Sequence, residues 1–283
     1  GKTPVSIALA KQAKKLGRKP GFLTRGHGGS MTVAHLVDAK KDLARHVGDE
    51  PLLLAGHAPT LVAPDRLTGA RELIGIGCDF IIMDDGFQSA RLHMDYAVMV
   101  VDARRGLGNG HVIPGGPLRA RLIDQLRHAD AILTMGEGNA ADHVVRKASR
   151  AGRPVFQARL KPRGVRAIKG GRFLAFAGIG NPKKFFDSVA QAGGAVVEGK
   201  SFPDHHPYDD DDARDLIAAA EKEELQLITT EKDMVRLRGG SEALSALDEH
   251  CRVLQVEAAF DAPDMPVTII ESTIEAWRAR MLK

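Results

Sequence analysis

Short apolar runs alternate with longer amphipathic stretches along nearly all of the 283 residues. Phe80–Met83 and Ala131–Thr134 have the length and composition of buried strands, whereas Lys2–Leu16 is amphipathic and long enough for a helix. Strands that alternate with helices are typical of parallel sheets covered by helices. We therefore expect an α/β fold.

The individual elements follow from the same pattern. Strands are predicted at Gly21–Thr24, Pro51–Ala55, Phe80–Met83, Ala97–Asp102, Ala131–Thr134, Val155–Leu160, Phe173–Ala177, Leu225–Thr229 and Val253–Val256. Helices are predicted at Lys2–Leu16, Pro182–Ala192, about Asp210–Glu223 and Thr268–Met281. The acidic run Asp209–Asp212 is interpreted as the start of a helix, because four successive residues cannot all face one metal ion.

The length of the chain suits two domains of about 150 residues each. The stretch Lys161–Gly171 is polar and contains glycine and proline, which favours a boundary there. We therefore predict one domain over residues 1–162 and a smaller one over residues 163–283.

Composition excludes several classes of protein. Hydrophobic residues make up 43% of the chain and charged residues 27%, which is too polar for a bundle of membrane spans. The two cysteines, Cys78 and Cys251, are far apart, so neither a disulfide framework nor a structural zinc site is expected. The chain opens with Gly-Lys-Thr inside a motif and has no initiator Met, so we expect a preceding segment.

The formal net charge is +4, and its distribution is uneven. Seven basic residues and no acidic residue precede Asp38. Such a segment favours nucleic acid, an anionic membrane surface or an anionic substrate. Aromatic residues make up only 5% of the chain, too few for base stacking, and no nucleic-acid-binding motif is present, so nucleic acid is not an expected partner.

Gly1-Lys2-Thr3, followed by an amphipathic stretch, resembles the end of a P-loop. In that motif the glycine lets backbone N–H groups approach phosphates, the lysine reaches the β- and γ-phosphates, and the hydroxyl binds Mg²⁺. Pro4 would occupy the first helical turn, where its missing N–H costs nothing. Three residues alone are also compatible with an ordinary helix start.

The run Phe80–Met83 ends in Asp84-Asp85-Gly86. A carboxylate at the end of a buried strand beside a P-loop is where such proteins hold Mg²⁺. A strand followed by a turn is the alternative, but two adjacent acids favour a functional site. Asp102 also ends a predicted strand, and we place it below Asp84 and Asp85 because it is single.

Several polar loops are further candidates. Arg25 and Arg119 lie in glycine-rich segments and could hold phosphate, although each loop could also be a simple turn. The spacing of Gly106–Gly110 does not fit a dinucleotide-binding fingerprint. Asp204-His205-His206 lacks a third zinc ligand, so proton transfer by a histidine stays open there beside a surface turn. Thr229–Asp233, at the end of a predicted strand, is another polar cluster, in which Glu231 and Lys232 could simply form a solvated turn.

Taken together, an ordered set of segments resembles the tetraacyldisaccharide 4′-kinase family, the lipid A 4′-kinases of Gram-negative bacteria. The segments are Gly1–Pro4, Arg25–Gly29, Gly48–Pro51, Asp84–Gln88, Gly106–Gly110, Gly116–Arg119, Phe176–Pro182, Asp204-His205 and Thr230–Asp233. No single segment is decisive, but their order and spacing cover nearly the whole chain. The resemblance implies two Rossmann-like α/β/α domains, the N-terminal one of the P-loop NTPase type, with the active site in a cleft between them.

The resemblance also implies an activity, namely ATP- and Mg²⁺-dependent phosphorylation of the 4′-hydroxyl of tetraacyldisaccharide 1-phosphate to give lipid IVA. Family members work at the cytoplasmic face of the inner membrane, usually with an N-terminal hydrophobic anchor, which here would precede Gly1. The implied partners are the lipid A disaccharide precursor and the anionic inner-membrane surface. No protein partner can be inferred.

Transferred position by position, the family pattern implies roles for particular residues. The catalytic pair is Asp49 with His205, and His205 is chosen over His206 because it directly follows Asp204. The ATP ligands are Gly1, Lys2, Thr3 and Arg119, and the Mg²⁺ ligands are Thr3 and Asp84. The substrate-binding residues are Arg25, His27, Gly28, Gly29, Asp85, Gln88 and Asn109.

Two residues depart from the family pattern. His27 stands where the family more often has tyrosine, and Ala120 follows Arg119 where glutamate is common.

Two other functions are compatible with the P-loop and the basic segment: a P-loop kinase or ATPase acting on a small soluble metabolite, and a nucleotide-switched membrane-adaptor ATPase. Asp49 and Asp204-His205 favour the lipid kinase over an adaptor, which has no need of them.

Overall fold

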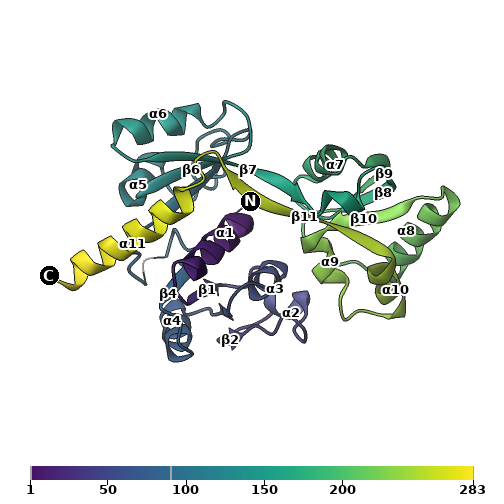
Figure 1. Ribbon diagram of the computed structural model, residues 1–283, viewed down its shortest axis with the longest axis horizontal. Helices are drawn as coiled ribbons and strands as arrows, with labels where there is room; N and C mark the ends of the chain where they lie inside the picture. The colour runs from purple at the N-terminus through teal and green to yellow at the C-terminus, as the bar shows by residue number, and fades with distance from the viewer. Residues whose placement is uncertain (1, 90, 283) are drawn as a thin grey trace. The chain divides into compact units, whose positions relative to one another are not determined.

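The computed structural model describes residues 2–89 and 91–282, and helices alternate with mostly parallel strands as the sequence predicts (Figure 1). By compactness the chain divides into two units, each built from segments that are distant in the sequence. The first unit contains Gly1–Pro20, Cys78–Leu160 and Ala258–Lys283, and the second contains Gly21–Gly77 and Lys161–Glu257. The predicted α/β class is confirmed.

This division differs from the predicted pair of consecutive domains, 1–162 and 163–283. One crossing between the units, after Leu160, lies close to the predicted boundary. However, helix α3 (Asp49–Ala55) packs against α9 (Glu231–Leu237), which groups an early segment with a late one. In the same way, α11 (Met265–Met281) packs against α1 (Lys2–Lys15).

The first unit is centred on three parallel strands in the order β5-β6-β7, with helices on both faces. The elements are α1 (Lys2–Lys15), β4 (Phe80–Met83), β5 (Val98–Asp102), α5 (Leu122–His128), β6 (Ala131–Met135), α6 (Asp142–Arg150), β7 (Val155–Arg163) and α11 (Met265–Met281). Side chains alternate along a strand, so Ile132 packs with α5 and α6 while Leu133 packs with α1 and α11. The β7 strand extends beyond Leu160 into the second unit.

The second unit contains parallel strands in the order β11-β10-β8-β9. Its elements in this part are η1 (Val165–Ala167), β8 (Arg172–Ala177), α7 (Pro182–Gln191), β9 (Ala195–Ser201), α8 (Asp210–Lys222), β10 (Gln226–Thr230), α9 (Glu231–Leu237), α10 (Glu242–His250) and β11 (Cys251–Phe260). Helix α7 covers one face of this sheet, and α8, α9 and α10 pack on the other face (Figure 1).

The remaining part of the second unit contains the early segment of the chain. Its elements are β1 (Pro20–Thr24), β2 (His35–Leu36), α2 (Ala44–Val47), α3 (Asp49–Ala55), β3 (Thr60–Val62) and α4 (Arg66–Gly75). Strand β1 pairs with β3 in parallel, and β2 pairs with β3 in antiparallel orientation. Val235 of α9 is buried with Val47 and Leu52, so α9 joins the two parts of this unit through one apolar cluster.

One predicted strand is wrong. Residues 51–55 lie in helix α3 instead of a strand. The run contains leucine and alanine, which favour helices, and no β-branched residue. Asp49 and Glu50 occupy the first turn, where the helix dipole favours acids. The run of apolar residues indicated burial correctly, but burial alone does not distinguish a strand from a short helix.

The prediction of the acidic run is confirmed, since Asp209 caps helix α8 and forms a capping box with Asp212. Over the residues that the structure describes, none of the helices combines the length and apolar character needed to span a membrane.

Candidate active site

The first turn of α1 and the end of β4 bring together the predicted phosphate and metal ligands of the first unit. Lys2 forms an ion pair with Asp85 through its ammonium group. The Oγ atom of Ser6, one turn later, lies 3.4 Å from Oδ1 of Asp84. Thr3 and Asp84 are both buried. This arrangement arises because the apolar strand β4 packs beside α1. The strand ends directly before Asp84 and Asp85, so that these two acids lie near the start of the helix.

Asp85 is the centre of a small charged cluster. Its Oδ2 lies 3.4 Å from Nη1 of Arg119, and the same guanidinium nitrogen donates to Oε1 of Gln88 at 3.3 Å. Burial raises the pKa of Asp85, but the hydrogen bonds and positive charges of Lys2 and Arg119 outweigh it, so the pKa lies below its usual value. The carboxylate therefore holds together the two cations that are predicted to bind phosphate.

The oxygen groups at this position suit a magnesium ion. A threonine hydroxyl and a carboxylate are hard oxygen ligands, and Mg²⁺ commonly takes one or two such protein ligands and completes its shell with phosphate and water. Within the described part of the chain, no group of three or more His, Cys, Asp or Glu residues is placed to hold a metal. A Mg²⁺ ion at this position would have Thr3 and Asp84 as its protein ligands.

In the second unit, Asp49 is placed by the junction between α2 and α3. Gly48 precedes it with a φ of 91°, and a Cβ atom at that glycine would lie 2.7 Å from the carbonyl oxygen of His27. Only glycine permits this close approach of the Arg25–Gly29 loop to the start of α3. The Asp49 side chain is 2% exposed, and its Oδ1 accepts the backbone N–H of Glu50 at 2.8 Å.

His205 lies against Asp49. Its Nδ1 is 3.3 Å from Oδ2 of Asp49, its Nε2 is 3.9 Å from Oδ1 of Asp204, and 36% of its side chain is exposed. The ring of His27 meets that of His205 edge-on, with centroids 5.6 Å apart. Gly28 faces the same ring. Four of the residues predicted from the sequence are therefore neighbours, although they come from distant segments.

The neighbouring histidine has a different environment. His206 Nε2 lies 2.7 Å from Oδ2 of Asp212, and its ring stacks on Phe202 and meets Tyr208 edge-on. These contacts link His206 to the start of α8 and to an aromatic cluster. His205 therefore lies beside Asp49, whereas His206 packs against the start of α8 and the aromatic cluster.

Sequence reasoning missed the residues that support Asp49. Arg236 binds the Asp49 carboxylate and also pairs with Asp233, and Lys232 pairs with Glu50 at 2.6 Å. Glu231 and Lys232, which could have formed a solvated turn, are instead the half-buried start of α9, and Asp233 beside them is fully buried. The Thr-Glu-Lys-Asp segment indicates this cluster, but no pattern indicates that Arg236 binds Asp49, 187 residues earlier in the chain.

Other predicted residues have less specific surroundings. Asn109 donates to the carbonyl of Gly115 at 2.8 Å and accepts from the backbone of His111 at 3.1 Å, so its side chain shapes its own loop. Arg25 is exposed, and Gly29 packs closely on the backbone of residues 46–48. Gly1 lies outside the described residues. The functional roles of all these residues stay predictions.

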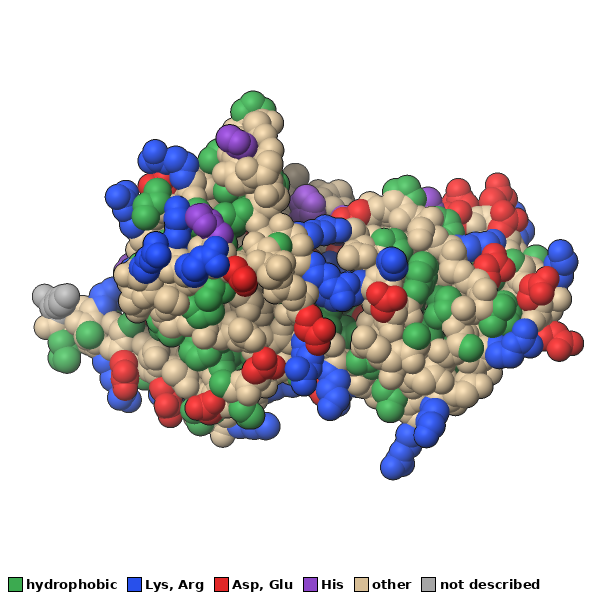
Figure 2. Space-filling view, turned by 90° about the horizontal axis from the view of Figure 1, so that it is seen from above, with side chains coloured by type: hydrophobic (Ala, Val, Ile, Leu, Met, Phe, Trp, Pro, Cys, Tyr) green, Lys and Arg blue, Asp and Glu red, His purple; other side chains and the backbone are tan. Residues whose placement is uncertain are grey.

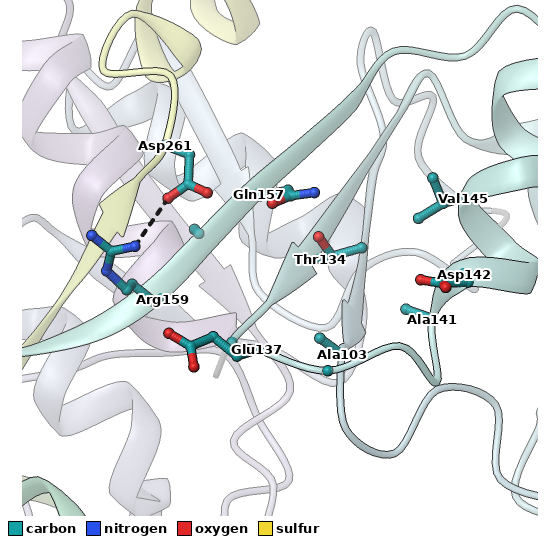
Figure 3. A pocket seen from close by; sticks show the side chains of 12 residues that line it. Ala103, Thr134, Glu137, Ala141, Asp142, Val145, Gln157, Arg159 and Asp261 are labelled. Carbon is teal, nitrogen blue, oxygen red and sulfur yellow. Dashed lines mark ion pairs between the residues drawn. The ribbon is translucent and has the colours of Figure 1, made fainter.

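A cavity of about 280 Å³ lies in the first unit at the carboxyl end of β6, beside the middle of β7 and the start of α6 (Figure 3). Thr134, Glu137 and Asp142 line it, and Arg159 pairs with Asp261 at its rim at 3.5 Å. Among the residues that the structure describes, the predicted ATP, metal and substrate ligands do not line this cavity.

Comparison with known proteins gives concordant matches. The family model for tetraacyldisaccharide-1-P 4′-kinase matches residues 1–275. A protein from Mesorhizobium japonicum named tetraacyldisaccharide 4′-kinase is 59% identical over 286 residues, covering 100% of this chain and 83% of the relative. A protein of the same name from Chelativorans sp. is 56% identical over 283 residues, covering 100% of this chain and 82% of the relative.

The fold is also similar to a solved structure. A crystal structure of LpxK from Aquifex aeolicus in complex with ATP superposes with a TM-score of 0.72 at 23% identity. The match covers 96% of this chain and 84% of that one. At this level of identity, the likeness supports the fold.

Proposed function

This chain belongs to the tetraacyldisaccharide-1-P 4′-kinase family, and on that basis we propose that it transfers the γ-phosphoryl group of ATP to the 4′-hydroxyl of tetraacyldisaccharide 1-phosphate. The products are lipid IVA and ADP. The observation that carries the proposal is the contact between Asp49 and Nδ1 of His205. An ATPase that only switches a partner has no need of an aspartate–histidine pair beside a hydroxyl acceptor.

The residues of the first unit would bind and polarise the nucleotide. Lys2 and Arg119 now share the carboxylate of Asp85, and both can turn to phosphate oxygens, which are stronger acceptors because of their charge. Mg²⁺ held by Thr3 and Asp84 would neutralise charge on the β- and γ-phosphates when bound. Positively charged donors around the γ-phosphoryl group stabilise the charge that develops as it is transferred.

The residues of the second unit would prepare the acceptor. A histidine whose Nδ1–H faces a carboxylate has an unprotonated Nε2, which can take a proton from a hydroxyl group. The proton of the 4′-hydroxyl passes to the Asp49–His205 pair as the oxygen bonds to the γ-phosphorus. The bond from that phosphorus to the bridging oxygen breaks, and its electron pair leaves with ADP.

We also propose that the protein works at the anionic, cytoplasmic surface of the inner membrane, because its acceptor carries acyl chains. Lys11, Lys14 and Lys15 are exposed on α1, and each basic residue close to an anionic surface contributes about 1 kcal/mol. On the face drawn in Figure 2, Lys and Arg side chains lie among acidic ones. Attraction to lipid would therefore be local and would weaken at high salt.

A transfer assay tests the proposed activity. Purified full-length protein is incubated with ³²P-labelled ATP and tetraacyldisaccharide 1-phosphate in detergent micelles, with Mg²⁺. We expect label in the lipid fraction, and omission of Mg²⁺ should abolish it. Absence of transfer by protein that still binds ATP would contradict the proposal, and transfer to a soluble sugar alone would favour a small metabolite as acceptor.

A further inference from the structure

The guanidinium group of Arg236 lies at the centre of a buried polar network in the second unit. Its Nε donates to Oδ2 of Asp49 at 3.1 Å, and its Nη2 binds the same oxygen. Its Nη1 donates to the carbonyl oxygen of Gly178 at 2.7 Å and to Oδ1 of Asp233 at 2.9 Å. Only 7% of the Arg236 side chain is exposed, so these contacts are shielded from water.

The network also fixes Arg236 itself. Asp233 accepts hydrogen bonds from the hydroxyl of Tyr208 at 3.0 Å, the hydroxyl of Thr230 at 2.6 Å and the backbone N–H of Gly178 at 2.9 Å. The Asp233 side chain is fully buried. A carboxylate with this many donors is held in one orientation, and it therefore fixes the arginine that binds its Oδ1.

Arg236 contacts Asp49 directly and is linked to His205 through the backbone of Gly178. The carbonyl oxygen of Gly178 accepts Nη1 of Arg236 and also the backbone N–H of His205, the latter at 3.0 Å. The backbone of His205 has a φ of 60°, which is unfavourable for histidine and needs support from its surroundings. One planar side chain therefore supports both members of the pair.

The same contacts limit what Asp49 can do. Its Oδ1 is occupied by the N–H of Glu50, and its Oδ2 by Arg236 and His205. Both oxygens of this buried carboxylate therefore already have partners, whereas the His205 side chain beside it is partly exposed. We infer that Arg236 is a positioning residue for phosphoryl transfer, because it fixes Asp49 against Nδ1 of His205. This inference rests on the proposed kinase activity.

The charges around Asp49 allow a second measurement, namely the pH dependence of the reaction rate. Burial raises the pKa of Asp49, but the charge of Arg236, the charge of Lys232, the hydrogen bond from Arg236 and the charge of His205 together hold it below its usual value. Glu50, the neighbouring acid, is paired with Lys232. Removal of Arg236 would therefore raise the pKa of Asp49, and the acid limb of the pH–rate profile would move to higher pH.

The test compares three variants in the transfer assay. Arg236→Lys keeps the charge but loses the planar fork, and Arg236→Ala leaves a space that free guanidinium can enter. Arg238→Ala is the matched control, because Arg238 is exposed at the end of the same helix. Unfolding temperature and ATP affinity are measured for each variant, so that variants are compared only as folded proteins.

We expect Arg236→Lys to bind ATP as wild type does and to lose about 10²-fold in kcat, because a small misplacement of catalytic groups has effects of this size. Guanidinium chloride at millimolar concentration should restore part of the activity of Arg236→Ala, whereas sodium chloride should not. The acid limb of Arg236→Ala should move to higher pH, and Arg238→Ala should keep wild-type kcat.

The inference is overturned if folded Arg236→Lys keeps a kcat within threefold of wild type. It is also overturned if Arg236→Lys and Arg236→Ala lose activity only in proportion to unfolding, with no rescue by guanidinium and an unchanged pH profile in the folded fraction. The activity of the wild-type protein separates failure of the Arg236 inference from failure of the proposed function, because an inactive wild type contradicts the kinase activity itself.

Discussion

Two residues that sequence patterns singled out, Asp85 and His205, have backbone angles in the left-handed region, with φ of 51° and 60°. A non-glycine residue in this region costs on the order of 1–3 kcal/mol when its side chain is bulky, and such residues are concentrated at functional sites. Each of the two places its side chain against charged partners: Asp85 against Lys2 and Arg119, His205 against Asp49. The backbone conformation therefore supports a functional role for both.

The two adjacent histidines should differ sharply in function. We expect His205→Ala to lower kcat by about 10²–10⁴-fold, the usual contribution of a general base. His206→Ala should cost about 1 kcal/mol of folding free energy, because it loses the hydrogen bond to Asp212, and should keep kcat within a few-fold of wild type. Steady-state kinetics and thermal unfolding of both variants test this, and equal losses of kcat would refute the choice of His205.

Stability at low pH should report on Asp49. Its pKa in the folded protein is below the ordinary value of 3.8, so its ionised form stabilises the fold above that pH, and this stabilisation is lost as the pH falls through the folded-state pKa. The difference in unfolding free energy between wild type and Asp49→Asn should be constant above about pH 5 and should shrink below it. Urea unfolding at several pH values measures it. A difference that grows toward low pH would contradict the ion pairs seen at Asp49.

Asp84 and Asp102 offer a matched comparison for the metal, since both follow strands of the first unit. Asp84 is buried beside Ser6, whereas Asp102 is exposed and its Oδ1 accepts the backbone N–H groups of Arg104 and Arg105. Asp84→Asn should raise the Mg²⁺ concentration needed for half-maximal transfer at least about tenfold, because a ligand charge is lost. Asp102→Asn should leave this concentration unchanged, and the reverse order would exclude Asp84 as the metal ligand.

At the scale of elements, the apolar runs predicted the positions of the central strands, but they did not predict every strand and helix around them. β4, β5, β6 and β8 begin and end within one or two residues of their predicted bounds, because buried parallel strands are continuous apolar runs. Strand β9 was missed, since its side chains alternate between half-buried and exposed and include glycine and lysine. The helix α3 is not distinguished from a strand by the sequence, because a short buried helix and a short strand have the same apolar content.

The junction between α2 and α3 should be sensitive to the loss of one glycine. Gly48→Ala forces a positive φ on alanine and places its Cβ against the carbonyl of His27, so we expect a loss of at least about 1 kcal/mol in stability. Activity should fall as well, because Asp49 is the next residue. Gly75→Ala is the control: Gly75 ends α4 with open space around it, and alanine there should be neutral or stabilising. Equal stabilities of the two variants would contradict the role of Gly48.

At the scale of the whole molecule, most candidate residues could be identified from the sequence, but the residues that they contact could not. Asp49 and His205 could be chosen only through the family pattern, because no local pattern links residues so far apart. Arg236 could not have been found in that way, since an arginine on a helix is ordinary and its importance arises from a contact with Asp49. The same holds for the compact units, whose segments alternate along the chain. Pairings of this kind are set by tertiary packing.

The central claim is that the 4′-hydroxyl of the lipid disaccharide receives the phosphoryl group, and the position of the phosphate in the product tests it most directly. The lipid product of a preparative reaction with ATP is purified and examined by ³¹P–¹H correlation NMR. We expect two phosphorus signals, one coupled to the anomeric proton of the original 1-phosphate and a new monoester coupled to H4′. A new signal coupled to any other proton, or release of free phosphate with the lipid unchanged, would contradict it.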